Sequence, residues 1–255
     1  MKSIPSKRER KVVVIIPALN EEKTVGGIIT SIPRTPLPFT KTSVIIIDDG
    51  STDNTYEVAH SANADFILKH KQNQGVASAI KDGIDVALKM NPDVICTIDA
   101  DGQFDVREIP RVIKPVLENK ADLVIGSRFH KGNKLKHMPF LKIIGNRIIA
   151  KVISKIIRTE IADAESGFRA LSRQAAEELE LIGYFTFTHD MILDVWFQGL
   201  RIQEVPVSVT YFPDRESRAV KNVTKYSFGI LGVILIKFLR IIAAVLTGHD
   251  LKRKD

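Results

Sequence analysis

The first half of the chain alternates short apolar runs with helical patterns of hydrophobic and polar residues. The apolar runs are rich in Val and Ile and are continuous, as expected for strands of a parallel sheet that is covered on both faces. They occupy residues 12–16, 44–47, 65–68, 94–98 and 123–125. The helical patterns between them occupy residues 22–31, 52–61, 76–90 and 106–118. We therefore predict an α/β fold with an open, mostly parallel sheet and helices on both faces.

The second half of the chain changes to an amphipathic pattern, which predicts a helix over residues 138–158. Polar and basic residues recur there every three or four positions and are expected to share one face, with isoleucines covering the other. The polar set is Lys142, Asn146, Arg147, Lys151, Lys155 and Arg158. Further along, we predict a strand-and-helix region at 168–181, a helix near 189–198, a strand at 202–209 and an apolar helix at 226–246.

Four polar clusters follow the predicted strands. In a doubly wound sheet, ligands bind beyond the carboxyl ends of the strands, so we expect these clusters to converge on one rim. The clusters lie at residues 17–22, 48–53, 99–103 and 126–128, and they are mainly acidic.

The pair Asp99 and Asp101 is the strongest chemical signal in the sequence. Two carboxylates this close repel each other unless a cation lies between them. Hard oxygen ligands suit Mg²⁺ or Mn²⁺, and Gln103 offers a further amide oxygen. Such a cation would bridge two phosphates of a nucleotide and stabilise a departing diphosphate. The alternative is a solvated turn in which one Asp caps a helix.

The other clusters combine turn formation with hydrogen-bonding capacity. Gly50 permits a tight turn with positive φ, which leaves one neighbouring carboxylate to accept hydrogen bonds from a ribose or a base edge. Pro17 is expected to end the first strand and Asn20 to cap the next helix. Glu21 would then lie at the positive end of that helix. Capping alone is the alternative interpretation of both clusters.

Composition narrows the class of partner. The chain has 255 residues, a net charge of +7 and a sequence pI of about 9.4, which favours polyanionic partners. A nucleic-acid partner is excluded because the predicted rim is acidic and no basic segment is interleaved with aromatic residues. The single cysteine, Cys96, excludes a disulfide framework and a cysteine-rich metal site.

Together these segments resemble the family 2 glycosyltransferases, which have the GT-A fold. The resemblance is strongest to the dolichyl- or polyprenyl-phosphate sugar transferases, such as dolichyl-phosphate mannosyltransferase. It covers residues 11–225 and is carried by the segments PALNEE, IIDDGSTD, NQGVASAIKDG, ICTIDADGQFD, VIGSRF, ADAESGFRAL and FTHDMILDVWFQGLRIQEVPV. The Gln-x-x-Arg-Trp motif of processive members is absent from the sequence, which argues against a polysaccharide synthase.

The resemblance implies a role for each matching residue. Contacts with the nucleotide would come from Pro17, Leu19, Glu21, Ile47, Asp49 and Ala100. The metal would be held by Asp99, Asp101 and Gln103. The acceptor phosphate would meet Arg128, Asn146, Arg147, Ser166, Arg169 and Arg218, the last in a mobile loop with Ser217. The catalytic set would be Asp99, Asp101, Arg128 and Asp190.

The implied reaction is a single inverting transfer of a hexose, mannose or glucose, from GDP-mannose or UDP-glucose to a lipid phosphate. A phosphate has a second pKa of about 6 and is largely dianionic at neutral pH, so its oxygen needs little help from a general base. Asp190 would then position the acceptor or assist a proton transfer. A glycosyltransferase with a soluble acceptor and a non-catalytic nucleotide-sugar-binding protein remain the alternatives.

The basic helix at 138–158 suits the surface of an anionic membrane. The alternative is an ordinary surface helix that packs on the core and keeps its lysines in solvent. Segment 226–246 is long enough to span a bilayer, but Lys237 and Arg240 would cost about 2.5–3.5 kcal/mol each. We therefore expect an interfacial helix, or one docked against a membrane-protein partner, with a complete span as the alternative. The expected organisation is a GT-A domain at 1–225, with a nucleotide part (11–128) and an acceptor part (129–225), then a C-terminal helix and basic tail at 226–255. The expected place is the cytoplasmic face of a membrane.

Overall fold

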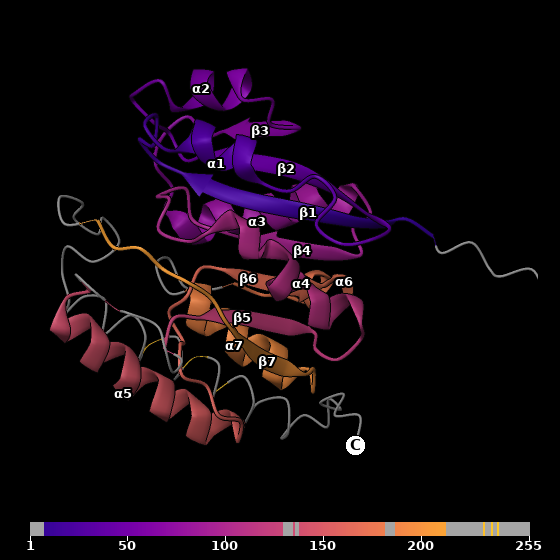
Figure 1. The fold of residues 1–255 in the computed structure, drawn as a ribbon. Coiled ribbons are helices and arrows are strands. Elements are labelled where there is room, and N and C mark those ends of the chain that lie inside the picture. Colours follow the sequence, from indigo (N-terminus) through magenta and orange to yellow (C-terminus); the bar gives the residue numbers. More distant parts are fainter. Residues whose placement is uncertain are drawn as a thin grey trace, which may run out of the picture.

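The computed structural model describes residues 8–129, 135, 138–181 and 187–212, together with 232, 236 and 239. One seven-stranded sheet runs through this part of the chain in the order β3-β2-β1-β4-β6-β5-β7 (Figure 1). The strands are β1 (Arg10–Ala18), β2 (Thr40–Asp48), β3 (Phe66–Lys69), β4 (Val94–Thr97), β5 (Leu123–Ser127), β6 (Arg169–Ser172) and β7 (Ile202–Pro206). The five strands predicted in the first half are thus confirmed.

All strands except β6 run in one direction. The pairs β1–β2, β1–β4, β2–β3 and β5–β7 are parallel, whereas β6 is antiparallel to both β4 and β5. The carboxyl ends of six strands therefore lie at the same edge of the sheet. This edge carries the four polar clusters, as predicted.

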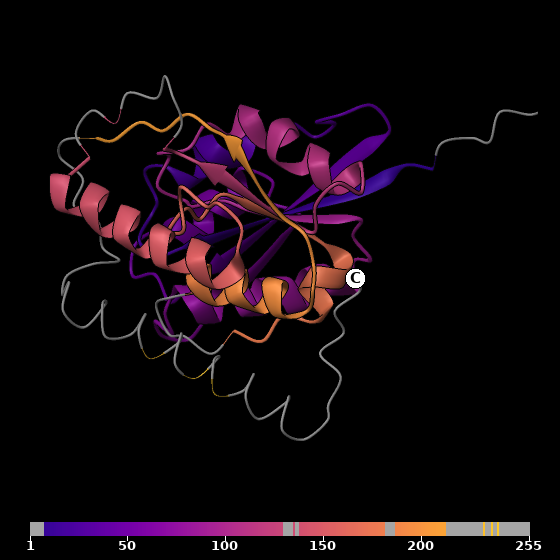
Figure 2. The same cartoon turned by 90° about the horizontal axis from the view of Figure 1, so that it is seen from below.

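Helices cover both faces of the sheet, as predicted (Figure 2). One face carries α1 (Val25–Ser31), α2 (Thr55–Ser61), the short 3₁₀ helix η1 (Val106–Glu108) and α4 (Ile109–Leu117). The other carries α3 (Val76–Lys89), α5 (Phe140–Ile157), α6 (Arg173–Glu177) and α7 (Phe187–Phe197). The two covered faces explain why the apolar run of β1 is continuous. Val14 packs into the core on the first face and Ile15 into the core on the second, and both are completely buried.

The prediction that Pro17 ends the first strand is wrong. Strand β1 continues through Pro17, which is paired in register with Ile47 of β2. Pro17 and Ile15 are two residues apart, so their backbone polar groups point to the same side of β1. On that side, which faces β4, the carbonyl of Ile15 accepts a hydrogen bond from Ile98 N. Strand β4 ends at Thr97, opposite Ile15, so no ladder partner stands where the missing N–H of proline would point.

The helix predicted at 138–158 is present as α5, but its two faces differ from the prediction. Asn146 is completely buried rather than part of an exposed polar stripe. Conversely, four apolar side chains spaced four residues apart are exposed. The other apolar residues of α5 are enough to form the face that packs on the protein core. These four are Phe140 (72% exposed), Ile144 (38%), Ile148 (59%) and Val152 (43%).

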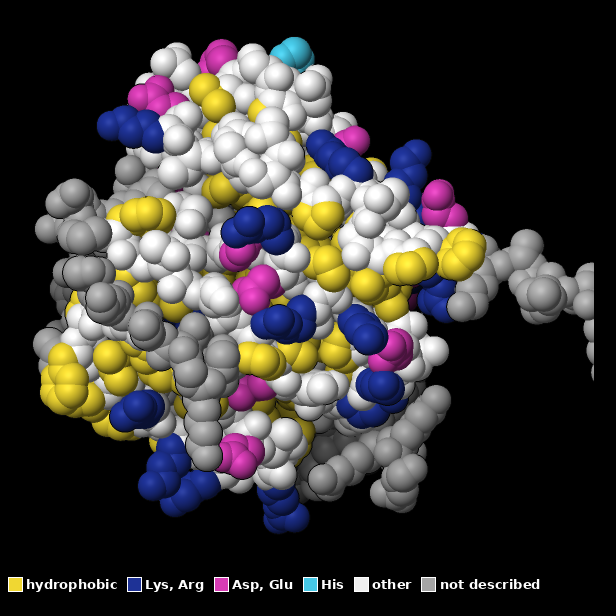
Figure 3. Space-filling view, viewed as in Figure 1, with side chains coloured by type: hydrophobic (Ala, Val, Ile, Leu, Met, Phe, Trp, Pro, Cys, Tyr) yellow, Lys and Arg dark blue, Asp and Glu magenta, His cyan; other side chains and the backbone are white. Residues whose placement is uncertain are grey.

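The surface of α5 is consequently apolar and basic together. Arg147, Lys151 and Lys155 are exposed beside the four apolar side chains, a set we call the α5 surface. Figure 3 shows yellow side chains gathered at the lower left, where Figure 1 draws α5, with dark blue side chains next to them.

The predicted C-terminal helix at 226–246 and basic tail lie outside the described residues, apart from positions 232, 236 and 239. Among the residues that the structure describes, no helix is both long and apolar enough to cross a membrane.

Candidate functional site

The loops after β1 and β2 are hydrogen-bonded to each other. Asn20 has a left-handed backbone with φ of 52°, and its Oδ1 accepts a hydrogen bond from Thr52 N at 2.8 Å. Its own N–H donates to Ser51 Oγ at 2.9 Å, and Glu21 N donates to Thr55 Oγ1 at 2.7 Å. The prediction that Asn20 caps the following helix is therefore wrong: α1 begins at Val25, and the Asn20 amide ties down the neighbouring loop.

A threonine that the sequence reasoning missed joins these loops to the aspartate turn. Thr24 Oγ1 lies 2.8 Å from Glu21 Oε2 and 2.8 Å from the carbonyl oxygen of Ala100. The residues proposed to contact the nucleotide are thus brought together at one end of the rim. Pro17, Leu19 and Glu21 are half-buried, whereas Ile47 and Ala100 are buried.

Asp49 holds a turn that begins after β3. Its Oδ1 accepts from Gln74 N and its Oδ2 from Gly75 N, both at 2.8 Å, and His70 Nδ1 lies 2.7 Å from Oδ1. Gly50 has the predicted positive φ, at 75°. A nucleoside contact from Asp49 would therefore use the remaining acceptor capacity of a carboxylate that already organises the protein.

Asp99 and Asp101 lie directly beyond β4, in the middle of the rim. Burial and the neighbouring Asp101 carboxylate raise the pKa of Asp99 to about 7. Burial is the larger cause of this shift and the second carboxylate the next, and a cation bound between the two carboxylates would favour their charged forms. A Cβ atom on Gly167 would lie 2.6 Å from both Asp99 oxygens, so the glycine leaves room for this carboxylate.

The side-chain oxygens of Asp99, Asp101 and Gln103 fit a hard divalent cation. Asp101 Oδ1 accepts from Gln103 N at 2.9 Å, which places Gln103 next to the two carboxylates in the same turn. Within the described ranges, no group of three His, Cys, Asp or Glu residues is placed to hold a metal. Two carboxylates and an amide would fill about half of the octahedral coordination shell of Mg²⁺ and leave the rest to phosphate and water, as is usual for Mg²⁺ bound with a nucleotide.

Arg128, just past β5, forms a buried ion pair with Asp163. Its N, Nε and Nη2 atoms donate to the Asp163 carboxylate at 2.9, 2.7 and 2.8 Å. Asn146 Nδ2 donates to the same carboxylate at 2.9 Å, and Arg128 Nη1 donates to the Tyr211 hydroxyl at 3.2 Å. The predicted acceptor residues Arg128 and Asn146 thus meet at Asp163, which the sequence reasoning missed.

The remaining predicted residues lie in different surroundings. Ser166 is buried and donates to the carbonyl of Gly126 at 2.6 Å. Arg169 is completely buried, and its guanidinium donates to the carbonyls of Ser166, Thr188 and Ala164. Asp190 is completely buried in the first turn of α7. The structure therefore places these three inside the scaffold under the rim. The charge of Arg169 also acts on Asp99, where it partly opposes the rise in the pKa of that carboxyl.

Two predicted parts of the acceptor site are not in this cluster as described. Arg147 is exposed on α5, and Ser217 and Arg218 lie outside the described residues. Lys142, by contrast, is half-buried and close enough to Asp101 for that charge to act on it. Burial and the charge of Arg128 lower the pKa of Lys142, and the charges of Glu165 and Asp101 act against that shift. The three- to four-residue spacing placed Lys142 on the helix but carried no sign that it faces the rim.

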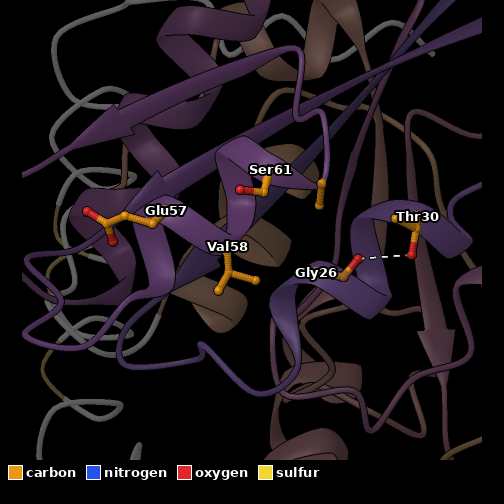
Figure 4. A pocket seen from close by; sticks show the side chains of 6 residues that line it. Gly26, Thr30, Glu57, Val58 and Ser61 are labelled. Atoms are coloured by element: carbon orange, nitrogen blue, oxygen red, sulfur yellow. Dashed lines mark hydrogen bonds between the residues drawn. The ribbon is translucent and has the colours of Figure 1, made fainter.

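A shallow groove lies elsewhere, between α1 and α2 (Figure 4). It has a volume of about 440 Å³ and is lined by Gly26, Thr30, Glu57, Val58, Ser61 and Ala62. None of the predicted site residues lines it. The hydroxyl of Thr30 donates to the carbonyl of Gly26, so that polar group is used within α1.

Comparison with solved structures identifies the fold. Glucosyl-3-phosphoglycerate synthase from Mycobacterium tuberculosis, in complex with Mn²⁺, UDP and phosphoglyceric acid, superposes with a TM-score of 0.68 and 22% sequence identity. The match covers 89% of this chain and 78% of that one. The fold is GT-A, with the seven-stranded sheet described above.

Curated relatives are similar over most of the chain. A UDP-N-acetylglucosamine–dolichyl-phosphate N-acetylglucosaminyltransferase of Methanococcus voltae is 30% identical over 80% of this chain and 87% of its own length. A dolichol-phosphate mannosyltransferase of Pyrococcus furiosus is 29% identical over 79% of this chain and 56% of its own length. The sequence profile described as "Glycosyl transferase family 2" matches residues 13–180. That match spans the strands, the loops and the aspartate turn of the rim, and the chain therefore belongs to glycosyltransferase family 2.

Proposed function

We propose that this glycosyltransferase moves a hexose, mannose or glucose, from a nucleotide-diphosphate sugar to dolichyl or polyprenyl phosphate at the cytoplasmic face of a membrane. The observation that carries the proposal is the rim itself. There Asp99, one of the paired carboxyls, lies close enough to the Arg128 guanidinium for that charge to act on it. The names of the two curated relatives support a lipid-phosphate acceptor, and one of them adds N-acetylglucosamine to the candidate sugars.

The donor would lie across the ends of β1, β2 and β4. The residues at those ends would hold the nucleoside, and Asp99, Asp101 and Gln103 would hold Mg²⁺ or Mn²⁺ against the diphosphate. When bound, the cation would neutralise charge on the departing diphosphate. The solved relative that carries Mn²⁺ and UDP supports this arrangement. Thr24 would keep Glu21 and the carbonyl of Ala100 in place beneath the donor.

The acceptor phosphate would approach from the side of Arg128 and Lys142. A phosphate oxygen attacks the anomeric carbon while the bond from that carbon to the diphosphate oxygen breaks, so the configuration inverts. The attacking oxygen carries no proton that must be removed, because the phosphate is dianionic at neutral pH. An essential general base is therefore unnecessary, which agrees with the complete burial of Asp190.

A first prediction tests the reaction as a whole. Incubation of the protein with GDP-mannose, UDP-glucose or UDP-N-acetylglucosamine, Mn²⁺ and a short polyprenyl phosphate is expected to release nucleotide with one donor, and EDTA is expected to stop the release. The measurement is nucleotide release by coupled assay, with the glycosylated lipid identified by mass spectrometry. Release that needs no lipid phosphate, or that persists in EDTA, would refute the proposal. Faster release with a soluble alcohol would favour the alternative acceptor.

A second prediction concerns the α5 surface, which suits an anionic bilayer because its apolar side chains would enter the interface and its lysines would meet lipid phosphates. Lys151→Glu reverses a charge there and is expected to weaken binding on the order of 30-fold, since each cation near the membrane contributes about 1 kcal/mol. Co-sedimentation with vesicles containing phosphatidylserine at low salt measures this.

The matched control is Lys41→Glu, which makes the same charge change on an exposed residue of β2. It is expected to leave vesicle binding unchanged. Equal loss in the two variants would mean that only net charge matters, and no binding by the unmodified protein would remove the membrane surface from the proposal.

A further inference from the structure

We propose that His70 is a positioning residue of the donor site, held by both ring nitrogens between Asp49 and Asp82, and that this bridge sets the affinity for the nucleotide. The inference rests on the proposed function, because it takes the nucleoside to lie at the ends of β1 and β2. None of the motifs quoted from the sequence includes His70.

Both ring nitrogens of His70 face a carboxylate. Nδ1 lies 2.7 Å from Asp49 Oδ1, and Nε2 lies 3.0 Å from Asp82 Oδ2. The His70 and Asp49 side chains are each 5% exposed, whereas Asp82 is 36% exposed. The backbone N–H of His70 donates to the carbonyl of Asp48 at 2.8 Å, so the ring is fixed at the end of the β2–β3 pair.

The geometry lets both ring nitrogens make polar contacts with carboxylates, and the tautomer decides which nitrogen donates. The ring therefore links Asp49, just beyond β2, to Asp82 on α3. The charged groups around it are Asp48 at the end of β2, Asp49, Lys69 at the end of β3, Lys71 on the same turn and Asp82 on α3. Lys69 Nζ lies 3.7 Å from Asp48 Oδ2.

The contact matters because Asp49 connects His70 to the loop beside the donor. The same carboxylate accepts the N–H groups of Gln74 and Gly75, and a Cβ on Gly50 would lie 2.5 Å from the backbone of Gln72. The turn at 70–75 is thus packed directly on the end of β2, whose residue Ile47 is paired in register with Pro17. Loss of the His70 bridge would release this turn from the nucleoside end, while the aspartate pair and Arg128 would stay in place.

The test is direct binding of UDP and GDP, with Mn²⁺, by titration calorimetry at one fixed pH. Nucleotide binding needs no acceptor. His70→Gln is expected to weaken binding of the preferred nucleotide about tenfold or more, because a hydrogen bond to a charged group contributes about 1.5–3 kcal/mol. The kcat measured at saturating donor is expected to stay within about twofold. His60→Gln, on the exposed surface of α2, is the matched control and is expected to change neither value.

Asp82→Asn separates positioning from plain stability. In this variant His70 can donate from Nδ1 to Asp49 and accept at Nε2 from the side-chain amide that the substitution introduces, so the bridge is kept. The variant is therefore expected to bind nucleotide with nearly the affinity of the unmodified protein.

Two outcomes contradict the inference while leaving the proposed function in place: His70→Gln binds nucleotide as tightly as the unmodified protein, or Asp82→Asn weakens nucleotide binding as much as His70→Gln does. A fall in kcat with unchanged nucleotide affinity in His70→Gln would also contradict it. If the unmodified protein binds neither UDP nor GDP, the proposed function itself fails and the inference fails with it.

Discussion

Replacing Asp101 by Asn is expected to lower the turnover rate by about 10²–10³-fold while leaving the fold intact. The loss follows from the missing charge: a catalytic cation contributes several kcal/mol of transition-state stabilisation, and each 1.4 kcal/mol is about tenfold in rate. The fold should persist because Asp101 is half-buried in a turn and an Asn oxygen can still accept from Gln103 N. Single-turnover nucleotide release at saturating Mn²⁺ and a thermal melt measure the two effects.

The matched control is Asp105→Asn, four residues further along the same loop. Asp105 pairs with exposed Arg107 and accepts the N–H of that residue, a contact that Asn also makes. Its turnover is expected to stay within about twofold of the unmodified protein. If Asp101→Asn retained more than about a tenth of the activity, the two aspartates would not be the centre of the reaction.

The fold was predictable because its signals are local. Val14 and Ile15 are adjacent and are both completely buried, on opposite faces of the sheet, so the whole of β1 reads as one apolar run. That pattern is characteristic of a parallel strand covered on both faces. With the strands located, the rule for carboxyl ends predicted the position of the rim without further information.

The errors in the predicted elements have a different origin. Asn20 is a good capping residue by type, but its partner is Thr52, which is 32 residues away in the chain. Helix α5 is apolar on both its inner and its outer surface, so periodicity alone did not reveal which isoleucines face the core. Pro17 is tolerated because β4, the adjacent strand, has already ended at this level of the sheet. The sequence of β1 carries no information about where β4 ends.

The missed site residues also depend on distant partners. His70 follows β3 directly, so the rule that located the other clusters would have included it if that strand end had been searched. Asp163 lies within ADAESGFRAL, but its partner Arg128 is 35 residues earlier and Asn146 is on a separate helix. The resemblance predicted which residues would form the acceptor site, whereas the structure shows which of these residues contact one another.

Replacing Asp163 by Ala is expected to lower the free energy of unfolding by about 3–5 kcal/mol, the usual result of leaving one member of a buried ion pair uncompensated. The Asp163 side chain is completely buried and that of Arg128 is 12% exposed. The variant also removes the acceptor of Asn146 Nδ2, so α5 loses a connection to the loop before β6. Urea unfolding at neutral pH measures the change. The control Glu177→Ala breaks the exposed pair with Arg173 and is expected to change stability by no more than about 0.5 kcal/mol.

The dependence of this difference on pH gives a second check. Burial alone would raise the pKa of Asp163, but the charge and hydrogen bonds of Arg128 outweigh burial and hold that pKa below its ordinary value. A carboxyl with a lowered pKa stabilises the folded state above its unfolded pKa of about 3.9, and this contribution is lost as pH falls through the folded value. The gap between the unmodified protein and Asp163→Ala is therefore expected to be complete at neutral pH and to shrink below about pH 4. If the difference in free energy of unfolding stayed the same in acid, the variant would have lost packing rather than the ion pair. The charge of Arg128 would then have to be balanced by another group.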